Sequence, residues 1–433
     1  MFYIIRETKK QRVQTGRNAL RNKVVVTGMG TINPIANNVI ETWKNVLSGQ
    51  SGIGPITHFD TVDHTTKFAG EVKEFDPAER FGKKTARHMD RFVQFAVTAT
   101  EEALEDADLL ITDSNNTRTG VIIGTGIGGV STLEKEASIL TQKGPKRVSP
   151  FMVPMMLPDT AAGQVAINFG AKGPNLCVTS ACASSTNAIG EATEMIRRGA
   201  ADIIIAGGAE AAITPVTIAA FANMGALSTR NNDPSTACRP FDLDRDGFVA
   251  GEGAAILILE SESHAIERGA KIYAEITGYG LTNDAHHITA PASNAESAIL
   301  CMQLAIEDSK IKPTDIMYIN AHGTSTPLND KTETLAIKKV FGDYAYNIPI
   351  SSTKSMHGHL LGGAGALEAI LCINSITNSK IPPTINHCTD DPECDLDYTL
   401  HQFRTISPNV VMSNSFGFGG HNASLIFTKY NNN

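Results

Sequence analysis

The chain contains 433 residues, of which 42% are hydrophobic and 19% are charged. This length exceeds that of one typical domain, and the composition is that of an ordinary globular enzyme. The sequence has no run of about 18 or more consecutive apolar residues, which argues against a transmembrane helix. The net charge of −8 argues against nucleic acid as the main partner.

Residues 1–23 form a basic leader in an otherwise acidic chain, with seven Lys or Arg residues and one Glu. Such an Arg-rich, acid-poor segment is typical of an organelle-targeting peptide, although this one lacks the usual serines, and a disordered leader is the alternative. We therefore expect a plastid-type organelle as the location, with the cytoplasm or a mitochondrion as alternatives. The polar tail, residues 431–433, is expected to be disordered.

Apolar runs typical of strands alternate with helical runs along the chain, which predicts an α/β fold with largely buried sheets. The order of these runs repeats, because VTGMG recurs as ITGYG and ALEDADL recurs as AIEDSKI. The repetition predicts two similar halves, residues 24–270 and 271–430. In this register Cys182 and His359 are equivalent, each at the start of a helix that follows a strand.

The chain has seven cysteines, which is an odd number, and no two of them form a C-x-x-C pair. These features argue against a disulfide framework and a zinc site, and they favour a reducing compartment. Free cysteine is among the most buried residue types. We therefore interpret Cys177, Cys301 and Cys372, which lie in apolar runs, as small core side chains.

Cys182 stands where the strand-like run NLCVTS meets a helical run that ends at Gly199. At the start of a helix, free backbone N–H groups and the helix dipole stabilise a thiolate, and the same N–H groups can contribute to an oxyanion hole. The small neighbours Ala181 and Ala183 permit a sharp turn, as in a nucleophile elbow without its usual glycines. Without partners, a small buried side chain is an equally good interpretation of this cysteine.

Several histidines occupy turns that follow predicted strands. His322 follows the run IMYIN, whereas His357 and His359 lie with Lys354 at another strand-to-helix junction, and His421 follows the Gly-rich turn SFGFGG. Catalytic groups of α/β proteins gather at the carboxyl ends of strands. One cysteine and two histidines in such positions favour a catalytic site over a set of unrelated core residues.

The stretches SACASS, NAHGTSTPLND, SSTKSMHGHLLGGAGALEA and NSFGFGG together resemble the four active-site signatures of the beta-ketoacyl-[acyl-carrier-protein] synthases. The similarity is closest to the elongating type I/II enzymes of fatty acid synthesis and covers about residues 23–428. It implies the thiolase fold, in which two mixed-sheet halves pack as a five-layer α-β-α-β-α sandwich, usually in a homodimer. It also implies acyl carrier protein as the partner that delivers the substrates.

The resemblance assigns the chemistry to a few residues. Cys182 would take the acyl chain as a thioester. His322 and His359 would stabilise the enolate that forms as the malonyl unit loses carbon dioxide, because neutral imidazoles can donate hydrogen bonds to a developing oxyanion. The backbone N–H groups of Cys182 and Phe418 would form the oxyanion hole, and Phe418 would also gate the acyl channel.

Other residues would support this chemistry, again by resemblance. Lys354 would order the site electrostatically, with Glu333 as its partner. His357 and His421 stand where the family more often has Thr or another small polar residue, and we interpret both as structural. The substrate would contact Thr324 and Thr326 along the phosphopantetheine arm, Ile127 in the acyl pocket, and also Phe221 and Thr289.

The segment GKKTAR concentrates positive charge in an acidic protein. A solvated helix face is the simple explanation. The alternative is a docking patch for an acidic carrier protein, since complementary charge speeds encounter. The resemblance supports Lys84 and Arg87 as members of this patch, to which we also assign Lys83.

Two further motifs are interpreted as structural. GTGIGG (124–129) matches a dinucleotide-binding pattern, but no strand ending in Asp or Glu follows at the required spacing. DLDRDG (242–247) is similar to a calcium loop, but Glu252 falls at loop position 11 instead of 12. We expect Arg239 and Arg245 to pair with its acids, and we assign no metal and no cofactor.

The sequence therefore predicts an elongating condensing enzyme that joins an acyl chain on Cys182 to a malonyl unit. The first rival is a chain-length subunit of the same fold without catalytic activity, which the presence of Cys182 disfavours. The second is a nicotinamide-dependent oxidoreductase built on GTGIGG.

Overall fold

The computed structural model of the protein describes residues 21–431. Most of the predicted basic leader and the last two residues of the polar tail therefore lie outside the described residues. The end of the leader lies on the folded body, where Arg21 is 3.4 Å from both Asp308 and Glu194, and Lys23 is 3.2 Å from Glu262.

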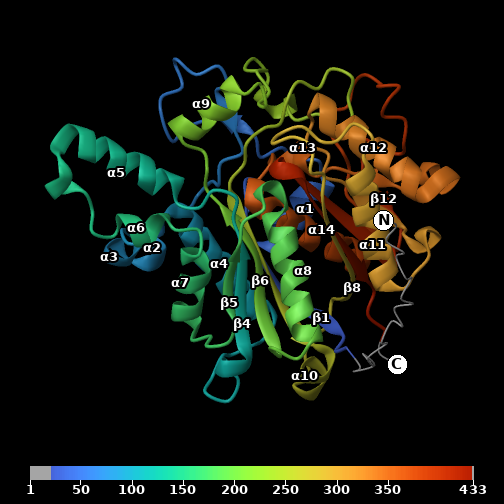
Figure 1. Cartoon of the computed structure of the whole chain (residues 1–433), viewed down its shortest axis with the longest axis horizontal. Coiled ribbons are helices and arrows are strands. Elements are labelled where there is room, and N and C mark those ends of the chain that lie inside the picture. The colour runs from blue at the N-terminus through green and yellow to red at the C-terminus, as the bar shows by residue number, and fades with distance from the viewer. Residues whose placement is uncertain (1–20, 432–433) are drawn as a thin grey trace, which may run out of the picture.

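Ten strands form one mixed sheet in the order β10-β9-β13-β14-β8-β1-β7-β6-β4-β5 (Figure 1). The first half of the chain supplies β1 (Val24–Ile32), β4 (Thr119–Gly124), β5 (Asn175–Val178), β6 (Ile203–Glu210) and β7 (Gly253–Ser261). The second half supplies β8 (Ala274–Asn283), β9 (Tyr318–Asn320), β10 (Ile350–Ser351), β13 (Val410–Gly417) and β14 (His421–Thr428). The two sets meet where β1 pairs with β8 through Val25–Glu275 and Val26–Ala274.

The two sets of strands have the same connectivity. In the first, β1 pairs antiparallel with β7, β7 antiparallel with β6, and β6 and β5 each parallel with β4. In the second, β8, β14, β13, β9 and β10 follow the same sequence of antiparallel and parallel pairings. The predicted α/β architecture with duplicated halves is thus confirmed.

Two buried helices, α8 (Ser184–Arg197) and α14 (Ala364–Asn378), contact each other and strands from both sets. On the outer faces, α4 (Arg91–Asp106) and α7 (Thr160–Phe169) cover the first set of strands, whereas α11 (Glu296–Ser309) covers the second and packs against α12 (Pro327–Phe341). The helices α8 and α14 thus lie between the two sets of strands, and the outer helices cover the other face of each set. Helices, strands, helices, strands and helices make the five layers that the resemblance implied (Figure 1).

The remaining elements border these layers, and α5 projects away from the body (Figure 1). The helices are α1 (Val39–Leu47), α2 (Pro77–Phe81), α3 (Lys83–Ala86), α5 (Val130–Lys143), α6 (Met152–Met156), α9 (Pro215–Asn223), α10 (Glu262–Glu267) and α13 (Lys354–His357). The short strands are β2 (Gly54–Pro55), β3 (Phe68–Ala69), β11 (Lys380–Ile381) and β12 (Arg404–Thr405). Within residues 21–431, none of the helices combines the length and apolar character that crossing a bilayer would require.

Local sequence explains several of the helix boundaries. Asp90 accepts a hydrogen bond from Phe92 N at the start of α4, and Thr214 accepts one from Thr217 N at the start of α9, so both side chains satisfy a free N–H group. Gly170 ends α7 in the left-handed conformation, which glycine adopts without strain.

The structure changes the predicted register of the two halves. A short 3-10 turn, Ala181–Ala183, precedes α8, and an equivalent turn, Leu361–Gly363, precedes α14. The first residue of each turn has a positive φ, +49° and +47°. The equivalent of Cys182 is therefore Gly362, and the predicted equivalence with His359 is wrong. His359 comes earlier because it first pairs with a neighbouring segment, donating from N to Val249 O at 2.7 Å.

Candidate active site

A cavity of about 470 Å³ opens where the ends of β9 and β13 meet the turn before α8. Cys182, His322 and His359 all line this cavity. The same cavity is lined by the other predicted substrate contacts, which are Ile127, Phe221, Thr289, Thr324, Thr326 and Phe418. The structure thus brings together residues that are separated by up to nearly 300 positions in the sequence.

The other predicted residues lie outside the cavity lining. Lys354 and Glu333 are buried behind it. Lys83, Lys84 and Arg87 are exposed in and after α3, on another part of the surface.

Cys182 and the two histidines form a compact group. The Cys182 sulfur and one ring nitrogen from each of His322 and His359 lie within 4.8 Å of one another. The two imidazole rings are almost perpendicular, with an interplanar angle of 82° and a centroid distance of 5.3 Å. All three residues are buried, although each of them lines the cavity.

Cys182 lies in the middle of the strained turn, and the helix proper begins two residues later. The backbone N–H groups of Phe418 and Cys182 itself face its sulfur and, like the charge of Lys354, lower its pKa. Burial has the larger effect and raises the pKa of the thiol to about 11. The backbone N–H groups at the helix start thus favour the thiolate, as expected, but the loss of water on burial outweighs them.

Gly417 allows β13 to approach the cysteine turn closely. A Cβ atom at this position would lie 2.9 Å from Ser180 O and 3.0 Å from Cys182 N. The absent side chain leaves the two N–H groups beside the sulfur accessible, an arrangement that can bind an oxyanion.

His359 is held in one orientation and one tautomer. Its backbone pairs with the segment Val249–Gly251, since Gly251 N also donates to His359 O at 2.8 Å. Its Nδ1 accepts a hydrogen bond from Leu361 N at 3.2 Å, so the ring proton resides on Nε2. That Nε2 is buried and has no hydrogen-bond partner among the described residues, which leaves it as a free donor beside the cavity.

His322 follows β9 and is fixed through its backbone. The Glu333 carboxylate, on α12, accepts from His322 N and Gly323 N, both at 2.8 Å. Glu333 therefore shapes the His322 loop, and the prediction that it is the partner of Lys354 is wrong. Burial raises the pKa of Glu333 to about 7, although both backbone donors oppose this effect.

Lys354 forms a fully buried ion pair with Glu368 on α14. Sequence reasoning missed Glu368, although a single acid within the apolar run AGALEAILCI is a visible signal of a buried partner. Burial raises the pKa of Glu368 to about 7, and the charge of Lys354 acts in the opposite direction.

Both histidines are neutral at physiological pH. Burial first, and then the positive charge of Lys354, lower the pKa of His322 and of His359 well below the usual value of 6.5. Metal ligation by His359 is disfavoured, because its Nδ1 already uses its lone pair and its Nε2 carries the proton. The group is instead suited to donating hydrogen bonds into the cavity.

The loop that carries Thr324 and Thr326 is held by hydrogen bonds from Arg245 to its backbone. The two hydroxyl oxygens are 2.9 Å apart. Arg245 donates to Thr326 O and Pro327 O, both at 3.1 Å, and its guanidinium is 2.6 Å from Asp391. The loop therefore presents two adjacent hydroxyls on a rigid base.

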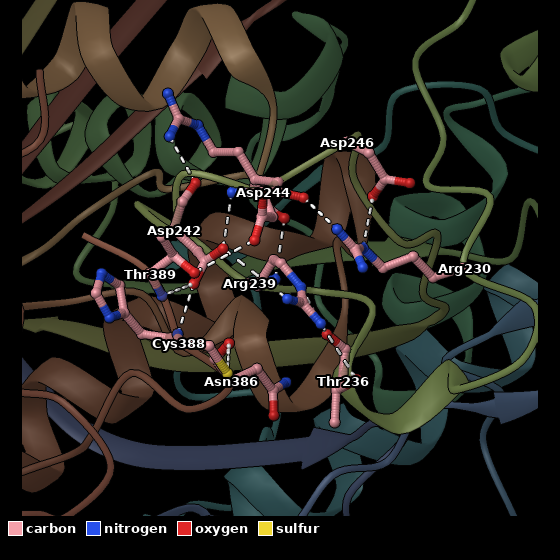
Figure 2. Close-up of polar contacts among 12 residues, drawn as sticks. Arg230, Thr236, Arg239, Asp242, Asp244, Asp246, Asn386, Cys388 and Thr389 are labelled. Carbon is pink, nitrogen blue, oxygen red and sulfur yellow. Dashed lines mark hydrogen bonds and ion pairs between the residues drawn. The ribbon is translucent and has the colours of Figure 1, made fainter. Parts of the chain in front are cut away.

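The acids of DLDRDG form internal contacts (Figure 2). The Asp242 carboxylate accepts from the backbone N–H groups of Asp244 and Thr389, both at 2.8 Å, and also from Cys388 N. Arg239 lies 3.9 Å from Asp242, as predicted, and Arg230 lies 3.6 Å from Asp246. N–H donors that face Asp242 disfavour a cation there.

The prediction that Arg245 pairs with the acids of DLDRDG is wrong. This arginine pairs with Asp391 and lies 3.7 Å from Asp330, whereas its contact with Asp242 is to the backbone oxygen at 2.7 Å.

The N–H groups of GTGIGG face a buried carboxylate from the same chain. Glu210 accepts from Gly126 N at 2.6 Å and from Ile127 N at 3.2 Å. An internal anion thus occupies the position at which a dinucleotide phosphate would bind, which argues against the oxidoreductase alternative.

The two unusual histidines lie outside the cavity lining. His357 is fully buried, and its nitrogens are 2.7 Å from Gly358 O and 3.0 Å from Thr353 Oγ1. Burial lowers the pKa of His357 to about 3, so it is a neutral structural residue. His421 begins β14, close to Gly419.

Comparison with known protein families gives two matches that together cover most of the chain. The profile described as Beta-ketoacyl synthase, N-terminal domain, matches residues 21–265. The profile described as Beta-ketoacyl synthase, C-terminal domain, matches residues 273–387.

Similar proteins carry the same kind of name. The chain is 54% identical over 413 residues to a 3-oxoacyl-[acyl-carrier-protein] synthase 2 of Synechocystis, covering 95% of this chain and 99% of that protein. It is 53% identical over 408 residues to a synthase of the same name from Staphylococcus aureus, covering 94% and 98%.

Solved structures share the fold. A ketosynthase in complex with its type II polyketide acyl-carrier protein and bound to a hexaketide has a TM-score of 0.89 and 36% identity, covering 95% of this chain and 100% of its own. A beta-ketoacyl synthase from Burkholderia phymatum has a TM-score of 0.88 and 38% identity, with the same coverage.

The raised pKa of Cys182 predicts how its alkylation depends on pH. The thiolate is the reactive form, and its fraction increases about tenfold per pH unit below the pKa. We expect the rate of iodoacetamide labelling at Cys182 to keep rising from about pH 7 to pH 9.5 without a plateau, because the pKa is about 11. Peptide mass spectrometry measures this rate, with the exposed Cys388 as the reference for reagent access. A plateau below pH 8 would contradict the raised pKa.

Proposed function

The chain belongs to the beta-ketoacyl synthase family, and we propose that the cavity around Cys182 is where it performs the condensation. It is an acyltransferase of the thiolase fold that elongates acyl chains in fatty acid synthesis. The observation that carries the proposed site is the group of one cysteine and two neutral histidines within 4.8 Å at the cavity.

The first step is acyl transfer to Cys182. Its sulfur attacks the thioester carbonyl of the incoming acyl group, and the N–H groups of Cys182 and Phe418 stabilise the oxyanion. Collapse of this intermediate expels the carrier thiolate, which takes the proton that the Cys182 thiol gives up. The positive charge of Lys354 favours the thiolate that must form during the attack.

The second step is decarboxylation and condensation. The malonyl unit loses carbon dioxide, and the electron pair of the broken C–C bond forms an enolate. His359 Nε2–H and the His322 ring stabilise the enolate oxygen as neutral donors. The enolate carbon attacks the Cys182 thioester, and the C–S bond breaks. This step releases the 3-oxoacyl product and a Cys182 thiolate, which takes a proton from water to restore the thiol.

Two parts of the cavity suit two parts of the substrate. Thr324 and Thr326 supply the hydroxyls that would bind the amides of a phosphopantetheine arm. Ile127 and Phe221 pack in one apolar cluster, which suits the acyl chain. Thr289 lines the cavity beside these regions, and Phe418 would gate the acyl chain's entry.

Acyl carrier protein is the proposed carrier of both substrates. The named relatives are acyl-carrier-protein synthases, and one structural neighbour was solved with an acyl-carrier protein. The exposed Lys83, Lys84 and Arg87 offer positive charge on an acidic protein, which would attract an acidic carrier.

A homodimer is the proposed assembly. Strand β5 lies at the edge of the sheet and exposes 47% of Leu176. Neighbouring helices expose Ile167, on α7, and Val153, on α6. An exposed sheet edge with apolar neighbours is a surface on which another chain can pack.

Acylation at Cys182 gives the direct test of the proposed function. Incubation with a long-chain acyl-carrier thioester should add one acyl group to the wild type and none to Cys182→Ala, as measured by intact mass. His359→Ala should still become acylated but should lose about 100- to 1000-fold in malonyl decarboxylation, because one enolate donor is missing. Folded wild-type protein that gains no mass would favour the rival chain-length subunit.

The docking proposal predicts a salt-dependent defect. Lys84→Glu with Arg87→Glu should lower kcat/KM for acyl-carrier substrates about tenfold at low salt and leave that for acyl-pantetheine unchanged, because only the carrier meets the patch. The matched control reverses two exposed lysines elsewhere, Lys312→Glu with Lys339→Glu. Equal activity of both double variants on carrier substrates would rule the patch out.

The dimer proposal predicts the mass of the particle in solution. Sedimentation equilibrium should give twice the mass of one chain, and Leu176→Glu with Ile167→Glu should give one chain, because four charges would be buried at the interface. Ile40→Glu with Leu110→Glu, at exposed apolar positions elsewhere, should remain dimeric. A monomeric wild type would refute the assembly.

A further inference from the structure

Glu210 is a fully buried acid that the mechanism above does not use. It is the last residue of β6 and comes directly before a loop that leads to α9. Its position is close to the cavity, although its side chain does not line it. A buried carboxylate is costly unless donors satisfy it, so its partners indicate what it does.

Four hydrogen-bond donors converge on this carboxylate. Oε1 accepts from Thr125 Oγ1 at 2.9 Å and from Ile127 N at 3.2 Å. Oε2 accepts from Gly126 N at 2.6 Å and from Gly362 N at 3.0 Å. Burial raises the pKa of Glu210, and the four donors act in the opposite direction. Each oxygen thus accepts from two donors. Among the side chains of this shape, only a carboxylate has two oxygens that can both act as acceptors.

The donors come from two segments that are far apart in the sequence. Thr125, Gly126 and Ile127 belong to GTGIGG, whereas Gly362 lies in the turn before α14. A Cβ atom on Gly362 would lie 2.2 Å from Gly126 N and 2.8 Å from Glu210 Oε2. Glycine at 362 is therefore required for the two backbones to share one carboxylate.

Each segment contributes one side chain to the apolar part of the cavity. Ile127 follows Gly126, and Leu361 precedes Gly362, and both line the cavity. The two side chains belong to the same apolar cluster. The Leu361 N–H group also donates a hydrogen bond to Nδ1 of His359, so this turn directly contacts the His359 imidazole.

We propose that Glu210 is a positioning residue that determines which acyl chains the cavity accepts, by holding the Ile127 loop against the Leu361 turn. This inference rests on the proposed function, in which the acyl chain on Cys182 occupies the apolar part of the cavity. The carboxylate joins the two segments through backbone bonds, so the width between Ile127 and Leu361 depends on it.

Glu210→Gln is the sharpest variant, because the shape is kept while one oxygen becomes an NH2 group. That group would face two donors and repel them, which separates the two segments and widens the cavity. We expect the ratio of kcat/KM for palmitoyl over butyryl transfer to Cys182 to rise about three- to tenfold. Thr125→Val keeps the shape but removes one donor to Glu210, together with the acceptor of Gly128 N at 3.2 Å in the same loop. It should shift the ratio in the same direction by less.

Glu102→Gln is the matched control. Glu102 also accepts two backbone N–H bonds, from Thr31 N and Val39 N at 2.7 Å each, but it does not line the cavity or contact the two segments. We expect this variant to keep the wild-type ratio even if it lowers stability.

The outcomes separate this inference from the proposed function. A wild-type ratio in folded Glu210→Gln, or in Thr125→Val where Glu210→Gln does not fold, would overturn the positioning role. The same shift in Glu102→Gln would also overturn it, because general loosening would then explain the result. Absence of any acyl transfer to the wild type would contradict the proposed function itself.

Discussion

The close packing of α8 against α14 is the constraint on which the rest of the site depends. Gly365 permits it, since a Cβ atom there would lie 1.9 Å from Thr186 Oγ1. Each helix follows a turn whose first residue has a positive φ, and the two turns contact each other. Cys182 in one turn and His359 just before the other therefore reach one cavity, although each belongs to a different half.

Burial determines the charge state of this cavity. It raises the pKa of the Cys182 thiol and lowers that of both imidazoles, so all three groups are neutral at rest. The positive charge of Lys354 acts on all three groups, and the cost of burying it is offset by its ion pair with Glu368. Such a site suits a reaction in which negative charge develops on sulfur and then on an enolate oxygen. Donors that are already oriented stabilise that charge without rearranging.

The residues themselves were sufficient for the α/β class, the duplication and the placing of Cys182, His322 and His359 at strand ends, which converge in such a fold. The thiolase fold and the substrate contacts were implied by the family resemblance. The sequence was insufficient for the supporting contacts. Glu333 and Glu368 are both buried acids near Lys354, and only the orientation of α12 and α14 decides that Glu368 is its partner. The shift of His359 relative to Cys182 depends on a backbone pairing with Val249, which no local pattern signals.

The two equivalent turns show how one duplicated element acquired two uses. Both present a backbone N–H group at the middle position, from Cys182 in one half and from Gly362 in the other. In the first turn this N–H group and that of Phe418 face the Cys182 sulfur, an arrangement that can bind an oxyanion. In the second it donates to Glu210, an anion within the protein. Because an N–H group at such a turn must find an acceptor, the half without a substrate oxygen supplies a carboxylate, and that carboxylate joins the acyl-pocket loop to the turn beside His359.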